Sequence, residues 1–411
     1  MYLEEIPSGW KIAKMGDVCE LRKETINPSN FPDMPYVGLE HIDSGDPRLK
    51  KIGTSSEVNS SKSRFYSGDI LYGKLRPYLD KSVLVDFDGL CSTDILVLKS
   101  KESIVPQFVV NTIHTSQFLS YSISTSSGVN HPRTSWSSIS AFQFLLPPLP
   151  EQRAIARALR AVQAAREARL REIALERERK AALMEHLFTH GTRGEPTKMT
   201  EIGEMPESWE VVKFGKVIIS SAFGPRFSSN YYDPDGSVAT LRTTDLDNEG
   251  NINYSTMPLA KLELDGFKQH LLKSNDFLIT RSGTCGIAAI FEAFEKPVLP
   301  GAFIIRFRLS NEINPLFLKY YVNSQQGRNR ILQLAGGAVQ KNLSGTSLRT
   351  FQIPLPLLVD QDAIVRSLIA CDSKIAALDH EAHLHDKLFR AMLEELMTGR
   401  LRVGALATPS S

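Results

Sequence analysis

The sequence predicts an α+β protein made of two pseudo-repeated α/β domains, each followed by a long α-helix. Three observations predict this fold. Segments of the first half return in the second half, each copy mixes strand-like and helix-like patterns, and each copy ends in a long stretch without proline or glycine. A repeat that spans half the chain indicates two copies of one domain, because a solenoid would need short repeats.

The composition is that of an ordinary globular protein. The chain has 411 residues, of which 42% are hydrophobic and 23% charged, with 22 Pro and 26 Gly. This excludes disorder, collagen and small disulfide-rich scaffolds, and the length indicates two or three domains. The formal net charge of +2 excludes a uniformly basic nucleic-acid coat but permits local basic patches.

The cysteines and the N-terminal segment indicate the compartment. Cys19, Cys91, Cys285 and Cys371 form no C-x-x-C pair, so a zinc knuckle or a redox motif has no support and a reducing compartment is favoured. The N-terminal segment is acidic and lacks the apolar core of a signal peptide, and no apolar run is long enough to span a membrane. We therefore expect a cytoplasmic protein that does not enter the membrane.

The internal repeat holds its register over long stretches. The matching segments are Ile6–Val18 with Met205–Val217, Ser67–Lys74 with Ser274–Arg281, and the stretch Phe108–Thr189 with the residues 209 positions further along. Trp10 and Trp209 recur at the same place in this frame, and we expect both to anchor a domain core.

Within each copy, the hydrophobic patterns predict strands, then helices, then a loop. Alternation over Ile304–Leu309 predicts a half-buried strand, and Asp94–Lys99 predicts a more buried one. Amphipathic helices are expected next, over residues 105–123 and 314–332. The Ser/Gly-rich loops that follow are Thr125–Ser138 and Ala335–Ser347.

A long helix is expected at the end of each copy, from Glu151 to Thr189 and from Asp360 to Thr398. Proline before each start and an acidic residue in the first turn are typical of helix entry. Each helix would be roughly 55 Å long at 1.5 Å per residue, and an exposed helix of that length needs a partner. The predicted parts are residues 1–150 (first domain), 151–190 (first helix), 191–204 (linker), 205–358 (second domain), 359–399 (second helix) and 400–411 (tail).

A heptad pattern on the second helix predicts a coiled-coil seam. The seam positions expected on the two helices are Ile155, Leu159, Val162, Ile173, Leu183, Leu187, Ile364, Leu368, Ile375, Leu378, Phe389, Met392 and Leu396. The first helix is apolar at its ends, but Arg166, Arg169, Glu176 and Lys180 occupy its middle. The two helices could pair antiparallel within the chain, with a looser seam, a shifted register or a second protein at the charged middle.

Sequence motifs for catalysis are missing. The chain has no G-x-x-x-x-G-K-[ST] loop for ATP and no Asp/Asn-Pro-Pro-aromatic motif of an adenine methyltransferase. We therefore predict no catalytic residue and no metal ligand in this chain. A stand-alone nuclease or methyltransferase would need one of these motifs.

Several segments together resemble the specificity (S) subunit of type I restriction–modification systems. They are Tyr36–Gly45, Gly68–Lys81, Phe87–Leu98, Asn275–Thr284, Gly336–Ser344 and the two junctions between a proline-rich exit and a long helix. The resemblance implies two α/β target-recognition domains separated by two long α-helices that pack as an antiparallel coiled coil. Each domain would read one half of a split DNA target, and the helices would set the distance between the halves.

The resemblance also implies partners. The subunit would be non-catalytic and would position two modification (methyltransferase) subunits and two ATP-dependent restriction subunits on double-stranded DNA. No cofactor is expected on this chain, whereas S-adenosylmethionine, ATP and Mg are expected on the partner subunits. A stand-alone DNA-binding regulator or architectural protein would share every motif, and a neighbouring gene for an adenine methyltransferase would decide between the two.

Candidate DNA contacts are cationic or polar residues in loops at strand ends, where they can reach phosphates and base edges. Lys74, Arg76 and Arg281 directly follow the repeated strand, and further candidates lie in the Ser/Gly-rich loops and in the second domain. The full set is Lys74, Arg76, His131, Arg133, Arg226, Arg242, Thr243, Arg281, Lys341 and Asn342.

The two Ser/Gly-rich loops predict an asymmetric target. Residues 128–140 and 337–349 hold equivalent places in the two copies but share almost no side chains. Because different side chains on base edges select different bases, the two half-sites should differ. Methylome sequencing of cells that carry the chain with its methyltransferase should show a split, non-palindromic motif, and an uninterrupted palindrome would contradict this prediction.

Overall fold

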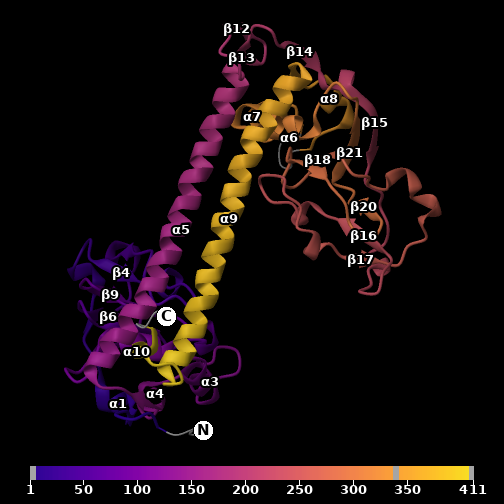
Figure 1. Cartoon of the computed structure of the whole chain (residues 1–411). Coiled ribbons are helices and arrows are strands. Elements are labelled where there is room, and N and C mark those ends of the chain that lie inside the picture. Colours follow the sequence, from indigo (N-terminus) through magenta and orange to yellow (C-terminus); the bar gives the residue numbers. More distant parts are fainter. Residues whose placement is uncertain (1–5, 337–341, 407–411) are drawn as a thin grey trace. The chain divides into compact units, whose positions relative to one another are not determined.

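The structure is a computed structural model that describes residues 6–336 and 342–406. The chain forms two compact units, which do not coincide with the two sequence copies. Unit 1 contains Met1–Leu170 and His380–Ser411, and unit 2 contains Arg171–Asp379. Each unit therefore holds one α/β copy together with the end of the other copy's long helix (Figure 1).

The same four-stranded antiparallel sheet lies at the centre of each unit. In unit 1 the strand order is β2 (Cys19–Leu21), β10 (Ile95–Ser100), β7 (Ile70–Gly73) and β8 (Ser82–Leu84). In unit 2 the order is β15 (Ile218–Phe223), β21 (Ile304–Leu309), β18 (Asp276–Thr280) and β19 (Ala288–Phe291). The strands expected at Asp94–Lys99 and Ile304–Leu309 are the second strand of these sheets.

A second sheet in each unit contains one parallel pair. The five-stranded sheet of unit 1 has the order β3 (Thr25–Ile26), β6 (Lys62–Phe65), β9 (Gly89–Cys91), β4 (Pro35–Val37), β5 (Gly53–Thr54). The three-stranded sheet of unit 2 has the order β17 (Leu259–Ala260), β16 (Val238–Leu241), β20 (Val298–Pro300). The parallel pairs are β4 with β9 and β16 with β20.

A short two-stranded ribbon joins the entry of each copy to its exit. The ribbons are β1 (Lys11–Lys14) with β11 (Gln143–Leu146) and β14 (Glu210–Lys213) with β22 (Gln352–Leu355), and a hairpin β12 (Thr197–Thr200) with β13 (Gly203–Pro206) precedes the second copy. Lys11 pairs with Leu146 just as Glu210 pairs with Leu355, so the sequence repeat is also a repeat of strand register.

The amphipathic helix expected after each central strand is divided into two. In unit 1 it forms α2 (Pro106–Ile113) and α3 (Ser116–Ser124), and in unit 2 it forms α6 (Pro315–Asn323) and α7 (Gln325–Gln333). The other short helices are α1 (Met15–Val18), α4 (Trp136–Ser140), α8 (Gly345–Thr350) and α10 (Val403–Leu406). The break comes from N-caps, because the Thr115 hydroxyl accepts from Phe118 N and the Ser324 hydroxyl accepts from Gly327 N.

The long helices α5 (Leu149–His190) and α9 (Leu358–Met397) run antiparallel. In unit 1, Arg169 Nε lies 2.7 Å from the Glu381 carboxylate. In unit 2, Lys374 Nζ lies 3.0 Å from Glu176, and Lys180 Nζ lies 2.5 Å from Asp372. The charged middle of α5 thus faces opposite charges on α9. None of the described helices is long and apolar enough to cross a membrane.

The side chains at the predicted seam positions are all buried or half-buried. Those that are buried are Ile155, Leu159, Ile173, Leu187, Ile364, Leu368, Leu378, Phe389 and Leu396, and those that are half-buried are Val162, Leu183, Ile375 and Met392. Toward the ends of each helix, these side chains join a domain core rather than a narrow two-helix seam.

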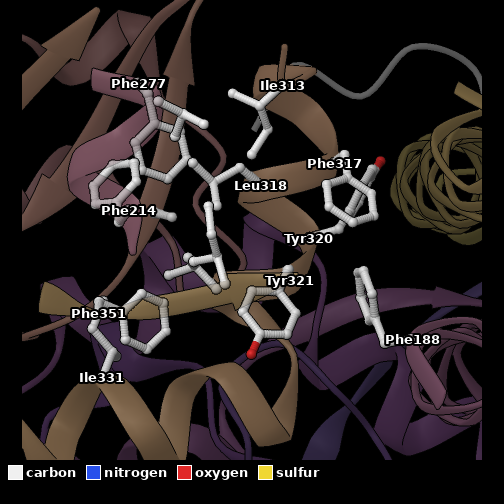
Figure 2. Close-up of a cluster of buried hydrophobic side chains, with 14 of the residues drawn as sticks. Phe188, Phe214, Phe277, Ile313, Phe317, Leu318, Tyr320, Tyr321, Ile331 and Phe351 are labelled. Atoms are coloured by element: carbon white, nitrogen blue, oxygen red, sulfur yellow. The ribbon is translucent and has the colours of Figure 1, made fainter. Parts of the chain in front are cut away.

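The core of each unit takes side chains from both sequence copies. In unit 1, Trp10 and Phe108 of the first copy share a cluster with Phe389 and Leu396 of α9. In unit 2, Phe188 of α5 contacts Phe317 and Tyr321, with ring centroids 5.6 and 5.4 Å apart (Figure 2). Trp10 and Trp209 are buried, as their repeated position predicts.

A buried glutamine fastens the start of each long helix to its own α/β copy. In unit 1, Val105 N donates to Gln152 Oε1 at 2.9 Å, and Gln152 Nε2 donates to Pro147 O at 2.9 Å. In unit 2, Asn314 N donates to Gln361 Oε1 at 2.6 Å, and Gln361 Nε2 donates to Pro356 O at 2.9 Å. Both side chains satisfy buried backbone groups at the junction.

Replacing this glutamine should destabilise one unit. Gln361→Leu leaves the Asn314 amide and the Pro356 carbonyl without partners, which should lower the free energy of unfolding of unit 2 by about 1–3 kcal/mol. Native-state hydrogen exchange of unit 2 peptides measures the change. Arg366→Leu, at an exposed position on the same helix, is the control. Equal protection in the two variants would contradict the role given to the junction.

Candidate nucleic-acid interface

Lys74 and Arg281 occupy equivalent places in the two units. Each directly follows a central strand, β7 in unit 1 and β18 in unit 2, and each is half-buried. Their carbonyl oxygens accept hydrogen bonds from Thr134 N at 3.0 Å and Leu343 N at 2.9 Å, respectively. The structure therefore brings the Ser/Gly-rich loop of each copy to the end of the strand that carries the predicted cation.

Each Ser/Gly-rich loop is closed at its base by a pair of backbone hydrogen bonds. Ser127 and Arg133 exchange bonds of 2.9 and 2.8 Å in unit 1, and Gly336 and Asn342 exchange bonds of 3.2 and 2.9 Å in unit 2. Gly128, with φ of 100°, permits the turn in unit 1. Arg133 and Asn342 thus hold the same place at the base of the loop.

Four predicted contacts gather in unit 1. Arg133 Nε lies 3.2 Å from Asp94 Oδ1, and Arg76 Nη2 donates to His131 Nδ1 at 3.2 Å. Arg76 N donates to Pro132 O at 2.7 Å, which ties the segment after Lys74 to the loop. Arg76 has a left-handed backbone with φ of 52°, a costly conformation for a residue with a side chain. Arg76 is thus strained at the point where the candidate contacts meet.

In unit 2, the predicted contacts Arg281 and Asn342 meet. Arg281 Nε donates to Asn342 Oδ1 at 3.2 Å, and the guanidinium carbon lies 4.9 Å from the centre of the Phe223 ring. One edge of the guanidinium is thus held, while its remaining N–H groups can serve phosphate or guanine. Lys341 lies outside the described residues.

Arg242 has a structural partner. Its Nη2 lies 2.7 Å from Asp245 Oδ1 and donates to Thr256 O at 2.7 Å, and the Asp245 carboxylate is fully buried. The hydrogen bond to Asp245 raises the pKa of Arg242. Burial raises the pKa of Asp245, but hydrogen bonds from Arg242 and Thr256 outweigh burial and lower that pKa below its usual range.

The backbone brings Arg242 near the Arg281 site, because Leu241 O accepts from Gly301 N and Phe303 O accepts from Arg281 N. Arg226 is exposed, and no hydrogen bond or ion pair of the described residues joins it or Arg242 to Arg281. Thr243 begins a short 3-10 turn, Thr243–Asp245, beside the Arg242–Asp245 pair. These three positions remain predictions.

Sequence reasoning missed the neighbours that orient the predicted cations. Asp94 holds Arg133, and Phe223 lies under Arg281. The repeat alone could not have found Asp94, because Phe303 holds the equivalent place: Asp94 O accepts from Lys74 N just as Phe303 O accepts from Arg281 N. The described part of the chain contains no cluster of three or more His, Cys, Asp or Glu that could hold a metal ion.

Comparison with known proteins agrees with the duplicated architecture. The family described as Type I restriction modification DNA specificity domain matches residues 7–176 and 206–382, one match per copy. The type I restriction enzyme MjaVIII specificity subunit of Methanocaldococcus jannaschii is 25% identical over 432 residues, which cover 97% of this chain and 94% of the relative. The type I restriction enzyme EcoDI specificity subunit of Escherichia coli is 31% identical over 157 residues, 38% of this chain and 35% of the relative.

Solved structures share the fold. A chain from a study of complex assembly and conformational transition of the type I R-M system superposes with a TM-score of 0.63 at 20% identity, covering 97% of this chain and 100% of its own. The type I restriction–modification S subunit of M. genitalium gives a TM-score of 0.55 at 14% identity, covering 96% and 98%.

The duplicated α/β frame, the paired long helices and the equivalent strand-end positions define a class of duplicated α/β proteins in which each unit combines one copy with parts of both long helices. This chain belongs to the type I restriction modification DNA specificity family. The resemblance found in the sequence is confirmed, as is the expected role of a specificity subunit rather than an enzyme of the complex.

The structural role of Arg242 can be separated from DNA contact. Arg242→Ala leaves the buried Asp245 carboxylate unpaired and should lower the stability of unit 2 by about 2 kcal/mol at neutral pH. Because the folded-state pKa of Asp245 is lowered, the contribution of the pair is present above the ordinary aspartate pKa of about 3.9 and is lost as pH falls further. The difference between wild type and variant should therefore shrink in acid.

Urea unfolding at pH 7 and pH 3 measures this difference, and DNA binding by the assembled complex provides the second readout. We expect the salt dependence of binding to stay unchanged in Arg242→Ala. A reduced salt slope with unchanged stability would instead make Arg242 a phosphate contact.

Proposed function

We propose that this chain recognises a split, asymmetric DNA target and positions adenine-methyltransferase and restriction subunits on it. The observation that carries the proposal is the repeated strand-end site, which places Lys74 in unit 1 and Arg281 in unit 2 beside equivalent loops. A cation next to a polar loop supplies both a phosphate contact and base-edge contacts.

The two sites offer different chemistry to DNA. Unit 1 presents Lys74, Arg76, His131 and Arg133, whereas the described part of the unit 2 site presents Arg281 with Asn342. Arginine pairs well with guanine, and asparagine pairs well with adenine. Different side chains at equivalent places support two different half-sites rather than a palindrome.

The proposed partners follow from family membership and from the missing motifs. Two modification subunits would bind S-adenosylmethionine, and two restriction subunits would bind ATP and Mg, in the cytoplasm. The duplication within this chain supports two copies of each partner, because the same arrangement of strands and helices occurs twice. A regulator without an enzymatic partner is not favoured by relatives that are named restriction-enzyme specificity subunits.

Alanine substitution at the strand-end cations tests the DNA contact. If Lys74, Arg76 and Arg281 touch phosphates, each substitution should weaken binding to all sequences and lower the salt slope by roughly one. If one of them reads guanine, the loss should be confined to one base pair and amount to roughly 1–3 kcal/mol. Binding by the complex with its modification subunit is measured across a salt series.

Lys99→Ala is the matched control, because Lys99 is an exposed cation at the far end of β10 from Lys74. Unchanged affinity and an unchanged salt slope in all three variants would remove these residues from the interface.

The long helices should act as a ruler between the half-sites. One heptad inserted after Ile173 keeps the seam in register and adds roughly 10 Å of helix. The unread spacer should then lengthen by a few base pairs of 3.4 Å each, while both half-sites stay the same. Methylome sequencing of cells that carry the variant and its modification subunit reads the spacer directly.

A two-residue insertion at the same place is the control, because it rotates the seam and should abolish assembly. A heptad variant that remains active with the original spacer would show that the helices do not set the distance.

A further inference from the structure

One end of the central sheet of unit 2 exposes apolar side chains beside Arg281, and a phosphate contact by Arg281 would not require them. β15 ends at Phe223, β18 ends directly before Arg281, and β21 begins directly after Phe303. β21 lies between β15 and β18 and runs antiparallel to both. Phe223, Arg281 and Phe303 therefore lie at the same end of the three strands. The hydrogen bond from Arg281 N to Phe303 O, 2.8 Å long, fixes two of them side by side.

Phe223 and Phe303 are unusually exposed. The chain has 20 phenylalanines, all within the described residues, and among them only these two are exposed, at 44% and 53%. Exposed aliphatic residues are scattered over the described chain, and Ile219 on β15 lies at the other end of that strand from Phe223. Two exposed phenylalanines that flank one arginine therefore need an explanation that a single exposed residue would not.

The corresponding edge of unit 1 is chemically different. Asp94 holds the place of Phe303, because its carbonyl accepts from Lys74 N as the Phe303 carbonyl accepts from Arg281 N. The Asp94 carboxylate is used to hold Arg133. The phenylalanine at this position is thus found in unit 2 alone and is not a requirement of the shared fold.

We propose that Phe223 and Phe303 contact the 5-methyl group of thymine in the half-site read by unit 2, beside a phosphate or guanine held by Arg281. The inference rests on the proposed function and names the base chemistry of that same site. The thymine methyl is the one apolar group on the base edges of the major groove, and a phenylalanine side chain is a suitable partner for it.

The geometry favours contact with a methyl group over insertion between base pairs. One face of the Phe223 ring is covered by the Arg281 guanidinium, 4.9 Å from the ring centre. Gly345 also approaches this ring so closely that a Cβ there would lie 3.2 Å from Phe223 Cζ. The covered face of the Phe223 ring is therefore not available to stack on a base, whereas the exposed part of the ring can still touch a methyl group.

The test removes the methyl group from the DNA and the ring from the protein. The complex of the full chain with its modification subunit is bound to its methylome-defined target, in which each thymine of the unit 2 half-site is replaced in turn by deoxyuridine. For wild type, at least one replacement should weaken binding about fourfold, the affinity equivalent of one buried methyl-sized group.

In Phe303→Ser or Phe223→Ser, binding to the thymine target should fall by a similar or larger factor, and the deoxyuridine replacement should then have no further effect. Phe303→Leu, which keeps an apolar side chain, should retain part of the sensitivity. Met199→Ala, at an exposed residue of the β12–β13 hairpin, should leave the response to deoxyuridine unchanged.

The experiment separates a failure of the thymine contact from a failure of the proposed function. If wild type binds its target but every deoxyuridine replacement is neutral, or if the replacement and the Phe303→Ser effect simply add, the thymine contact is overturned while DNA recognition stands. If the wild-type complex shows no preference for any DNA sequence, the proposed function itself fails.

Discussion

The antiparallel pairing of α5 with α9 is the interaction on which the rest of the structure depends. Each helix begins in its own α/β copy, fastened by Gln152 or Gln361, and contributes its far end to the core of the other unit. Phe188 therefore packs in unit 2, and Phe389 packs in unit 1. Neither α/β copy has a complete core by itself, so the helix pair is a structural part of both recognition units.

Charged contacts make this pairing specific. Arg169 with Glu381, Glu176 with Lys374 and Lys180 with Asp372 pair opposite charges across the antiparallel helices where apolar residues are sparse. An ion pair also recurs in each unit between an arginine just after the end of one long helix and an acidic residue in the first turn of the other. The recurring pairs are Arg193 with Asp360 and Arg402 with Glu151, both with 2.7 Å between Nε and the carboxylate.

Local patterns in the sequence predicted the helices and strands. They did not predict that the end of each long helix packs into the core of the other copy. The repeat, the tryptophan anchors and the long helices follow from spacing alone, and the N-caps Thr115 and Ser324 could have placed the helix breaks. The mixed cores could not be predicted, because which helix end fills which core depends on tertiary packing. For the candidate site, strand-end position predicted the equivalent places of Lys74 and Arg281, and their contact with DNA stays a prediction. The exposure of Phe223 and Phe303 has no signature in a sequence where most phenylalanines are buried.

Hydrogen–deuterium exchange on the Leu396→Ala variant tests most directly whether the far end of each long helix completes the core of the other unit. Leu396 belongs to the second copy in sequence but is fully buried in the core of unit 1. Removing its side chain should speed amide exchange in unit 1, in α2 and in β11, and leave the central sheet of unit 2 unchanged. Faster exchange confined to residues 205–358, with unit 1 unaffected, would contradict the account.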